Sequence, residues 1–549
     1  MKKFVLLIFL LVLFLNTTAQ SPDGERPKLV VGIIVDQMRQ EYLYRFYNKF
    51  GEGGFKRLMN GGFMLQNAHY NYVPTWTAPG HASVYTGTTP GIHGVIGNDW
   101  FDKETNKRVY CVKDEKVTAV GGTLQEGNMS PHRLITTTIT DEIKIATQKR
   151  SKVIGLSIKD RGAIIPAGHM ADAAYWFDKI TGRFISSTFY MNALPTWVEN
   201  FNKLGLADKY ASKVWTPLLP LDQYIESAPD VNPYEGKISG AEKASFPYDV
   251  AAMKKAYGNY EALSETPFSD DLLTEMAKAT LDGEKLGQDE WVDFLCLSYS
   301  APDKLGHDVG PYAVELEDLY IRLDKNLEDL FKKLDQSVGS QNYVIFLTAD
   351  HAVSDVPQFM IDNKMSGGAL STSGIKARLD DYMKNYFPGK ELIRDLFNEQ
   401  IFLNHDVFSD DPKKGGVDLL VATELISSFL LQEKGVANVY SKSLIRQGDF
   451  SEGGYKGMVI RGHHPKRSGD IAFILEPHWV DFGRHQGADH SSPYAYDTHV
   501  PVLFYGKGIK KGKSVQYHPI TDIAPTLAIL LKTKFPSGCT GQPIAELFE

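Results

Sequence analysis

The chain has 549 residues, of which 43% are hydrophobic and 23% charged, and its formal net charge is -8. This composition is typical of a folded globular protein and argues against a disordered, collagen-like or polytopic membrane protein. The length allows one large core with inserted subdomains, or two domains. The negative charge offers nucleic acid no general attraction, so we expect no nucleic acid partner.

The first twenty residues have the layout of a secretory signal. Two lysines precede an unbroken apolar run at 4–15, and a small-residue site ends at Ala19. The run is short for a membrane span, and no cysteine follows that could carry a lipid. We therefore expect residues 1–19 to be cleaved, and the mature chain to be periplasmic or secreted without membrane attachment. Losing Lys2 and Lys3 changes the formal charge from -8 to -10.

Cysteine usage excludes a scaffold built on disulfides. Cys111, Cys296 and Cys539 allow at most one disulfide, even in the oxidising compartment that export implies. Cys296 lies inside an apolar run, so we expect a buried thiol there.

Six short apolar runs, separated by longer amphipathic stretches, predict buried parallel strands that are linked by helices. They lie at 28–36, 152–160, 291–300, 342–351, 470–477 and 499–506. The clearest helix is predicted within 311–339, where leucines recur at spacings of three and four, with Pro311 in its first turn and Gly339 just beyond its end. These patterns predict an α/β fold with a central, mostly parallel sheet that is flanked by helices.

The pattern loosens in two intervals, about 192–290 and 366–450, which are rich in Gly, Pro and Asp. We interpret them as cap insertions that cover the rim of the sheet. Residues 20–549 are then one domain with two inserted cap elements.

Carboxylates and imidazoles follow several of the predicted strands, where open α/β sheets place their ligands. Singly, such residues are more often helix caps, turn formers or satisfied polar groups. Three aspartates and three histidines at one rim are hard to explain in that way. Together they form a ligand set suited to zinc and large enough for two ions. The six residues are Asp36, Asp303, His307, Asp350, His351 and His490.

A short helix is predicted in the stretch "TAPGHASVYTG", with Thr77 as its N-cap, a proline early in the helix and Gly87 past its end. Most such threonines are structural caps only. A neutral threonine hydroxyl is a poor nucleophile, and no histidine–aspartate relay is suggested beside it. A bound cation would lower the cost of ionising the hydroxyl. The reactivity of Thr77 therefore depends on the predicted metal site.

Seven segments, in the same order and across nearly the whole mature chain, resemble the alkaline phosphatase superfamily. The similarity is greatest to the phosphate-irrepressible alkaline phosphatases that use a threonine nucleophile. The segments are "VDQMR", "PTWTAPGHASVYTG", "HGVIGNDW", "SIKDRGAIIPAGH", "SAPDKLGHDVGP", "LTADHAVSD" and "DHSSPYAYDTHVPVLFYG".

The resemblance implies a two-zinc site in which each ion has three protein ligands. Asp303, His307 and His490 match the ligands of one ion. Asp36, Asp350 and His351 match those of the other, which also binds Thr77. Asn98 matches a residue that holds a phosphoryl oxygen, and Lys159 and Arg161 match a pair that clamps the other oxygens. On residue type alone, "KDR" after a strand is only a charged loop.

The reaction that the resemblance implies is hydrolysis of small phosphate monoesters, with broad substrate range, through a phosphothreonine at Thr77. We expect a monomer. One motif departs from the family: its last histidine usually lies in "THGS", whereas this chain reads "DHSS", with His485 and His499 nearby. The "PYAYDTHVP" that follows sets the register on His490. Asp489 could point outward or perturb the site, and the sequence does not decide between the two.

Other functions are weighed against this one. A sulfatase needs a cysteine or serine followed by x-Pro-x-Arg, which "TAPGH" lacks, and a phosphoglycerate mutase would use serine and be cytosolic. A phosphodiesterase or nucleotide pyrophosphatase of the same superfamily is the main alternative. Lys159 and Arg161 favour the monoester, because a diester replaces one charged oxygen with an ester group. A non-catalytic exported metal- or phosphate-binding protein would be expected to have lost ligands, and no matched position is lost.

Overall fold

A computed structural model describes residues 26–409, 416–481 and 485–548. The predicted signal peptide lies outside these residues. Within them, every helix is too short or too polar to cross a bilayer.

A sheet of eleven strands forms the centre of the molecule. Its four middle strands are parallel neighbours and are buried along their whole length, which explains why they appear in the sequence as continuous apolar runs. They are, in spatial order, β12 (Tyr343–Thr348), β1 (Leu29–Val35), β11 (Asp293–Tyr299) and β6 (Val153–Ser157). The predicted α/β class, with a mostly parallel sheet flanked by helices, is confirmed.

The outer strands extend the sheet on both sides. Beyond β6 lie β7 (Ala173–Asp178), β8 (Arg183–Ser187) and β5 (Ala119–Val120). Beyond β12 lie β19 (His499–Gly506), β2 (Phe63–His69), β20 (Gly512–Ser514) and β21 (His518–Pro519).

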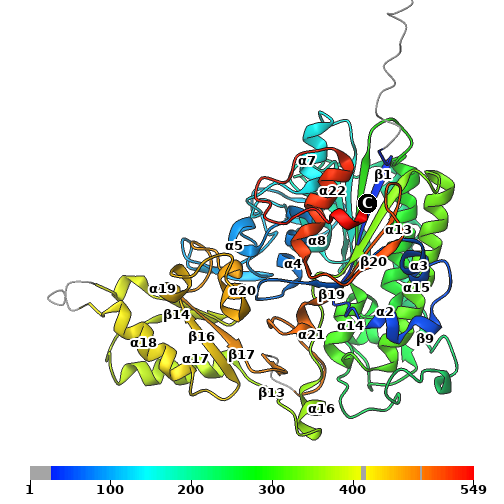
Figure 1. Ribbon diagram of the computed structural model, residues 1–549. Helices are drawn as coiled ribbons and strands as arrows, with labels where there is room; N and C mark the ends of the chain where they lie inside the picture. The colour runs from blue at the N-terminus through cyan, green and yellow to red at the C-terminus, as the bar shows by residue number, and fades with distance from the viewer. Residues whose placement is uncertain (1–25, 410–415, 482–484, 549) are drawn as a thin grey trace, which may run out of the picture.

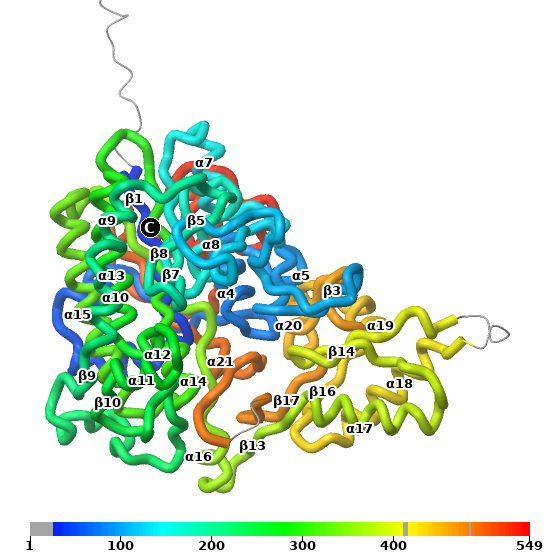
Figure 2. The backbone as a smooth tube through the Cα atoms, turned by 180° about the vertical axis from the view of Figure 1, so that it is seen from behind, coloured from blue at the N-terminus to red at the C-terminus, as the bar shows by residue number. Residues whose placement is uncertain are grey.

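Helices cover both faces of this sheet (Figures 1 and 2). One layer contains α13 (Pro267–Gly283) and α15 (Val314–Ser337). The other contains α4 (Thr77–Thr86), α8 (Asp160–Ala167) and α22 (Ile523–Leu531). The leucines of α15 are buried, as its spacing predicts. Pro311 is not in the first turn of α15, because residues 311–312 form a separate turn before the helix begins.

Two of the six predicted strands differ from expectation. The run at 499–506 forms β19, which is antiparallel to both β12 and β2. The run at 470–477 forms β17 (Ile471–Leu475), which is not in the central sheet. It pairs antiparallel in a separate four-stranded sheet. A short buried strand has the same apolar pattern in either sheet, so the pattern does not identify its partners.

The smaller sheet has its own apolar core and projects to one side of the central body (Figure 1). Its order is β14 (Ile393–Phe397), β15 (Gln400–Leu403), β17 and β16 (Val436–Ser441), packed on α17 (Thr372–Lys384) and α18 (Leu419–Leu430). This unit begins within the predicted insertion at 366–450 and takes its last strand from beyond it. The other predicted insertion, at 192–290, includes α13, which packs against β6 and β11.

A pair of buried carboxyl groups lies away from the carboxyl ends of the central strands. Glu315 is in the first turn of α15, and Tyr248 donates a hydrogen bond of 2.6 Å to its Oε1. Its Oε2 and both oxygens of Glu235 have no hydrogen-bond partner among the described residues. Burial, followed by repulsion from Glu315, raises the pKa of Glu235 well above its ordinary value.

Glu235→Gln is expected to stabilise the protein at alkaline pH. A carboxyl whose pKa is raised on folding contributes stability at low pH. This contribution is lost as the pH rises from the group's pKa in the unfolded state towards its pKa in the folded state. We expect the free energy of unfolding of the variant to exceed that of the wild type by at least about 1 kcal/mol at about pH 9, roughly the equivalent of one pKa unit, and by less at about pH 6. Urea unfolding at both pH values measures this. An equal difference in unfolding free energy at the two pH values would contradict the raised pKa of Glu235.

Candidate active site

The helix that carries Thr77 starts at the carboxyl end of the central sheet. Thr77 is the first helical residue of α4, and Trp76 is the N-cap, so the prediction of Thr77 as N-cap was wrong by one position. The chain stays extended through Trp76, and the Trp76 carbonyl accepts the first helical hydrogen bond from Gly80 at 2.9 Å. Gly87 ends the helix in the left-handed conformation, as expected. The Thr77 hydroxyl is therefore not a helix cap.

Close packing brings α4 against the end of β12. A Cβ on Gly80 would lie 2.1 Å from the Asp350 carbonyl oxygen, so only glycine permits this approach. As a result, Thr77 Oγ1 lies 3.4 Å from His351 Nε2. The glycine in "TAPGH" thus places the threonine hydroxyl beside the predicted ligands.

One predicted ligand set converges at the ends of two adjacent strands. Asp36 follows β1, and Asp350 and His351 follow β12; all three are fully buried. Their ligand atoms lie within 4.8 Å of one another, with His351 Nε2 at 3.5 Å from Asp36 Oδ1. Asp36 Oδ1 and Asp350 Oδ2 are buried and accept no hydrogen bond from any described residue. Buried carboxylate oxygens that accept no hydrogen bond and lie beside imidazoles are what a cation site requires, so these residues fit a metal ion.

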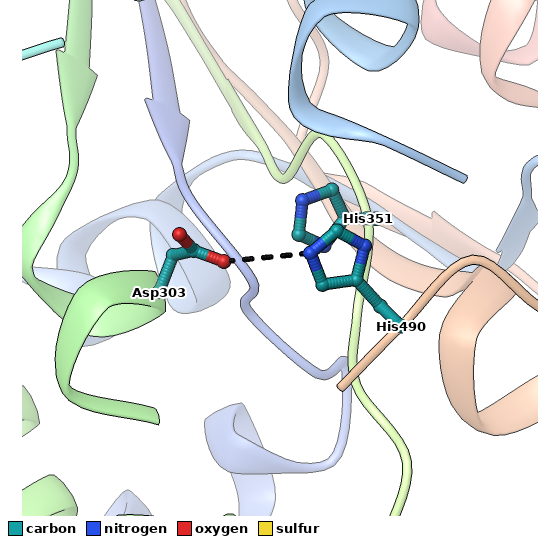
Figure 3. A group of neighbouring side chains, drawn as sticks. All are labelled: Asp303, His351 and His490. Carbon is teal, nitrogen blue, oxygen red and sulfur yellow. Dashed lines mark ion pairs between the residues drawn. The ribbon is translucent and has the colours of Figure 1, made fainter. Parts of the chain in front are cut away.

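The second predicted set lies next to the first. Asp303 and His307 are one turn apart on α14 (Ala301–Val309), with His307 Nε2 at 3.2 Å from Asp303 Oδ1. His490 comes from the loop before β19, and its Nε2 is 3.7 Å from the same oxygen. Figure 3 shows Asp303 pointing towards His490 and His351, whose rings stack with centroids 3.5 Å apart. The two sets are therefore neighbours that share one buried space.

Each of the three histidines has its other ring nitrogen held by a backbone carbonyl. The partners of Nδ1 are Ala352 for His351 at 3.0 Å, Ala488 for His307 at 3.0 Å and Thr75 for His490 at 2.6 Å. A carbonyl accepts only from N–H, so each Nδ1 carries a proton and each Nε2 is the ring nitrogen that faces the site. Metal-ligating histidines are commonly held in this way.

The electrostatics of the site follow from three carboxylates in one buried space. Burial, then repulsion from Asp303 and Asp350, raises the pKa of Asp36 well above its ordinary value. Although burial opposes it, Lys159 holds the pKa of Asp303 well below its ordinary range. Burial, then the neighbouring His351, lowers the pKa of His490, which favours the neutral form that binds metals.

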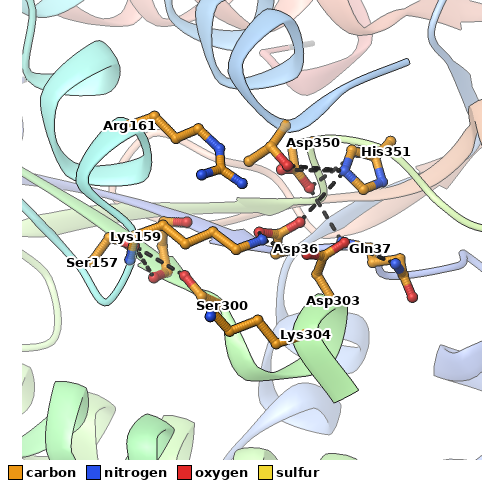
Figure 4. Close-up of polar contacts among 12 residues, drawn as sticks. Asp36, Gln37, Ser157, Lys159, Arg161, Ser300, Asp303, Lys304, Asp350 and His351 are labelled. Carbon is orange, nitrogen blue, oxygen red and sulfur yellow. Dashed lines mark hydrogen bonds and ion pairs between the residues drawn. The ribbon is translucent and has the colours of Figure 1, made fainter. Parts of the chain in front are cut away.

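Lys159 and Arg161 reach the site from the start of α8 (Figure 4). Lys159 Nζ is 2.6 Å from Asp36 Oδ2 and also contacts Asp303 Oδ2. Arg161 Nη1 donates to the Tyr110 hydroxyl at 3.2 Å, and its buried Nε has no partner among the described residues. Both cations point towards the carboxylate cluster in Figure 4.

Asn98 lies beside the start of α4. Its Oδ1 accepts a hydrogen bond of 2.9 Å from the backbone N–H of Ala78. This contact leaves the amide NH₂ as a donor close to Thr77. Of the predicted phosphate-binding residues, Asn98 thus contacts the first turn of α4, and Lys159 contacts the carboxylate cluster from the start of α8.

Two contact residues were missed from the sequence. His81, one turn after Thr77, bonds to the Thr77 carbonyl at 2.9 Å and to Ser298 Oγ at 2.8 Å, and lies 3.2 Å from Asp350. Its spacing of one helical turn from Thr77 could have predicted that the two residues lie on the same face of the helix. Thr75 supports His490 through its carbonyl and accepts from the Ser491 N–H through its hydroxyl. No local pattern indicates contacts between residues this far apart in the chain.

The "DHSS" motif keeps His490 at the site. His485 is exposed and contacts Gln358, and His499 bonds to the Gln66 carbonyl, so neither joins the ligand sets. Asp489 points inward: its Oδ1 accepts from the His490 N–H at 2.9 Å and lies 3.6 Å from His307 Nδ1. Burial raises the pKa of Asp489 to about 6.

No disulfide supports the site. The three cysteines all lie in the described part of the chain and are free. Cys296 is buried in β11, as its apolar surroundings predict.

Comparisons with known proteins agree with this geometry. The chain is 44% identical over 527 residues to "Alkaline phosphatase PhoV" of Synechococcus elongatus, covering 95% of this chain and 93% of that protein. It is 43% identical to "Alkaline phosphatase PafA" of Elizabethkingia meningoseptica, covering 95% and 94%. A similar relative from Myroides odoratus, 42% identical over 96% of both chains, is named a calcium-transporting ATPase.

Among solved structures, that of wild-type alkaline phosphatase PafA has a TM-score of 0.91 at 42% identity and covers 95% of this chain and 99% of its own. The family of type I phosphodiesterases and nucleotide pyrophosphatases matches residues 30–499. The resemblance to the alkaline phosphatase superfamily is therefore confirmed, and this chain belongs to the type I phosphodiesterase/nucleotide pyrophosphatase family within it.

Proposed function

We propose that the protein is an exported, zinc-dependent alkaline phosphatase that hydrolyses small phosphate monoesters. The observation that carries this proposal is the placement of Thr77 Oγ1 at 3.4 Å from His351 Nε2, in a buried carboxylate–imidazole cluster that Lys159 also contacts. The names of the relatives at 43% and 44% identity support the same activity.

Two zinc ions are the proposed cofactors. Asp36, Asp350 and His351 would hold one, and Asp303, His307 and His490 the other. When bound, the ions would make the threonine hydroxyl and water easier to ionise and neutralise charge on the departing oxygen. The nitrogen and oxygen donors suit zinc, and the histidine orientations fit it.

The proposed reaction uses the chain's own residues in two displacements. Thr77 Oγ loses its proton and attacks phosphorus, the bond from phosphorus to the ester oxygen breaks, and the alcohol leaves after taking up a proton. Water then attacks phosphorus from the side that the alcohol left, the bond from phosphorus to Thr77 Oγ breaks, and a proton from the water returns to Oγ as phosphate is released. Asn98, Lys159 and Arg161 would hold the non-bridging oxygens in place during both steps.

Binding of phosphate would require Lys159 to change partners. In the structure its ammonium group pairs with Asp36 and Asp303. Cations bound to those carboxylates would release it to contact a phosphoryl oxygen. Arg161 has a buried, unpartnered Nε and so keeps a donor available.

A structure of a PafA variant supports the choice of these residues. In that variant a threonine is serine, and an asparagine, a lysine and an arginine are alanine. The four residue types and their order along the chain match Thr77, Asn98, Lys159 and Arg161.

The double variant Lys159→Ala, Arg161→Ala tests the preference for monoesters. A monoester presents three charged or partly charged oxygens, whereas a diester replaces one of them with an ester group. We expect kcat/KM for an aryl monoester to fall by at least about 100-fold, the scale of losing two charge-assisted contacts, and that for the matching diester to fall much less. Equal losses would instead favour the alternative, a phosphodiesterase or nucleotide pyrophosphatase.

Export of the mature chain remains part of the proposal and rests on the N-terminal sequence. Mass spectrometry of the protein from the producing cell would give its first residue. Cleavage near Ala19 is the expected result.

A further inference from the structure

Gln37, directly after the predicted ligand Asp36, adopts a conformation that glutamine rarely takes. Its φ is 65°, in the left-handed region that favours glycine, and only 2% of its surface is exposed. A strained residue of this kind persists only where its surroundings hold it, and such residues concentrate at functional sites. The contacts of Gln37 therefore indicate what holds it in this conformation.

Two hydrogen bonds connect Gln37 to the two predicted ligand sets. Its side-chain Nε2 donates to Asp303 Oδ1 at 2.8 Å. Its backbone N–H donates to Asp350 Oδ1 at 3.2 Å. Asp303 belongs to one predicted zinc set and Asp350 to the other, so a single residue contacts a carboxylate of each (Figure 4).

The glycine at position 306 leaves the space that the Gln37 side chain occupies. A Cβ on Gly306 would lie 2.1 Å from Gln37 Oε1. Since α14 carries Asp303 and Gly306 three residues apart, the helix offers both the hydrogen-bond acceptor and the room for the amide. Backbone strain, one backbone and one side-chain hydrogen bond, and this close approach all involve the same residue.

We propose that Gln37 is a positioning residue that sets the separation of the two zinc sets, orienting Asp303 through its amide and Asp350 through its backbone N–H. This inference rests on the proposed two-zinc function. Two-metal hydrolases need a fixed separation between their ions, and groups that orient ligands commonly govern metal affinity. The inference assigns Gln37 no contact with substrate.

Gln37→Met removes the amide but keeps the length of the side chain and the backbone N–H. We expect the zinc at Asp303, His307 and His490 to bind about 10- to 100-fold more weakly, and the other zinc to be retained. Zinc per chain, measured by elemental analysis after equilibration with increasing chelator, would fall to one where the wild type still holds two. Activity should fall in parallel and recover with added zinc.

Two further variants separate positioning from folding. Gly306→Ala should displace the Gln37 amide without removing it, and should show the same selective loss of one zinc. Gln37→Gly relieves the left-handed strain, so it should fold at least as well as Gln37→Met and still lose that zinc. Gln400→Met is the matched control, because Gln400 lies in β15 of the smaller sheet, is 7% exposed, and its amide oxygen accepts from the Gly469 N–H.

The outcomes distinguish the inference from the proposed function. If the wild type binds two zinc ions and both Gln37 variants retain both at the wild-type affinity, the positioning role is wrong. A wild type that binds no zinc at these residues contradicts the proposed function itself. Equal weakening of zinc binding in Gln400→Met would mean that the loss reflects general destabilisation, which also overturns the inference.

Discussion

Thr77→Ala is expected to reduce kcat/KM for an aryl phosphate monoester by at least about 1,000-fold, because it removes the oxygen that forms the covalent intermediate. Thr77 Oγ1 is buried beside His351 and makes no capping hydrogen bond, so alanine should leave α4 intact. Acid-quenched protein, analysed by mass spectrometry, should carry phosphate on the peptide that contains Thr77 in the wild type and not in the variant.

Thr77→Ser is the matched control for this result. It keeps a hydroxyl at the same position and removes only a methyl group, so it should retain measurable turnover and a phosphorylated peptide. An alanine variant with near-wild-type rates would contradict the nucleophile assignment, as would phosphate on a different residue.

Removal of metal is expected to have an effect of similar size. Asp36, Asp303 and Asp350 share one buried space, and two of their oxygens have no hydrogen-bond partner among the described residues. Lys159 lies against two of these carboxylates, so cations that neutralise them would free its ammonium group for phosphate. Dialysis against a chelator should therefore abolish turnover, and zinc should restore it.

The metal should also stabilise the fold. A ligand present at 100 times its dissociation constant stabilises the folded state by about 2.7 kcal/mol per site. Unfolding of the chelated and the zinc-loaded protein would measure this, with chelator plus excess zinc as the control. Full activity in protein shown by elemental analysis to be free of metal would contradict the proposed cofactor.

The sequence predicted the centre of the fold because that centre depends on local pattern. Strands β1, β6, β11 and β12 are buried on both faces, so their apolar runs need no knowledge of partners. Their parallel alignment brings the residues that follow β1, β11 and β12 to one edge. The positions of Asp36, Asp303 and Asp350 were predictable from this rule.

Other features depend on long-range contacts that no local pattern contains. The strand β17 pairs with β15 and β16 in the smaller sheet, and β19 pairs antiparallel with β12. The partners lie far from these strands in the sequence. Thr75 supports His490 across more than 400 residues of sequence. The predicted N-cap, Thr77, differs from the observed N-cap, Trp76, by one residue. Helix ends are defined only to within one or two residues.

The central claim is that this site hydrolyses phosphate monoesters with zinc. It is tested most directly by paired rates for an aryl phosphate monoester and the matching diester, measured on one preparation with a defined zinc content. We expect the monoester to be the better substrate by kcat/KM and both rates to vanish in chelator. A preference for the diester, or rates that do not depend on zinc, would contradict it.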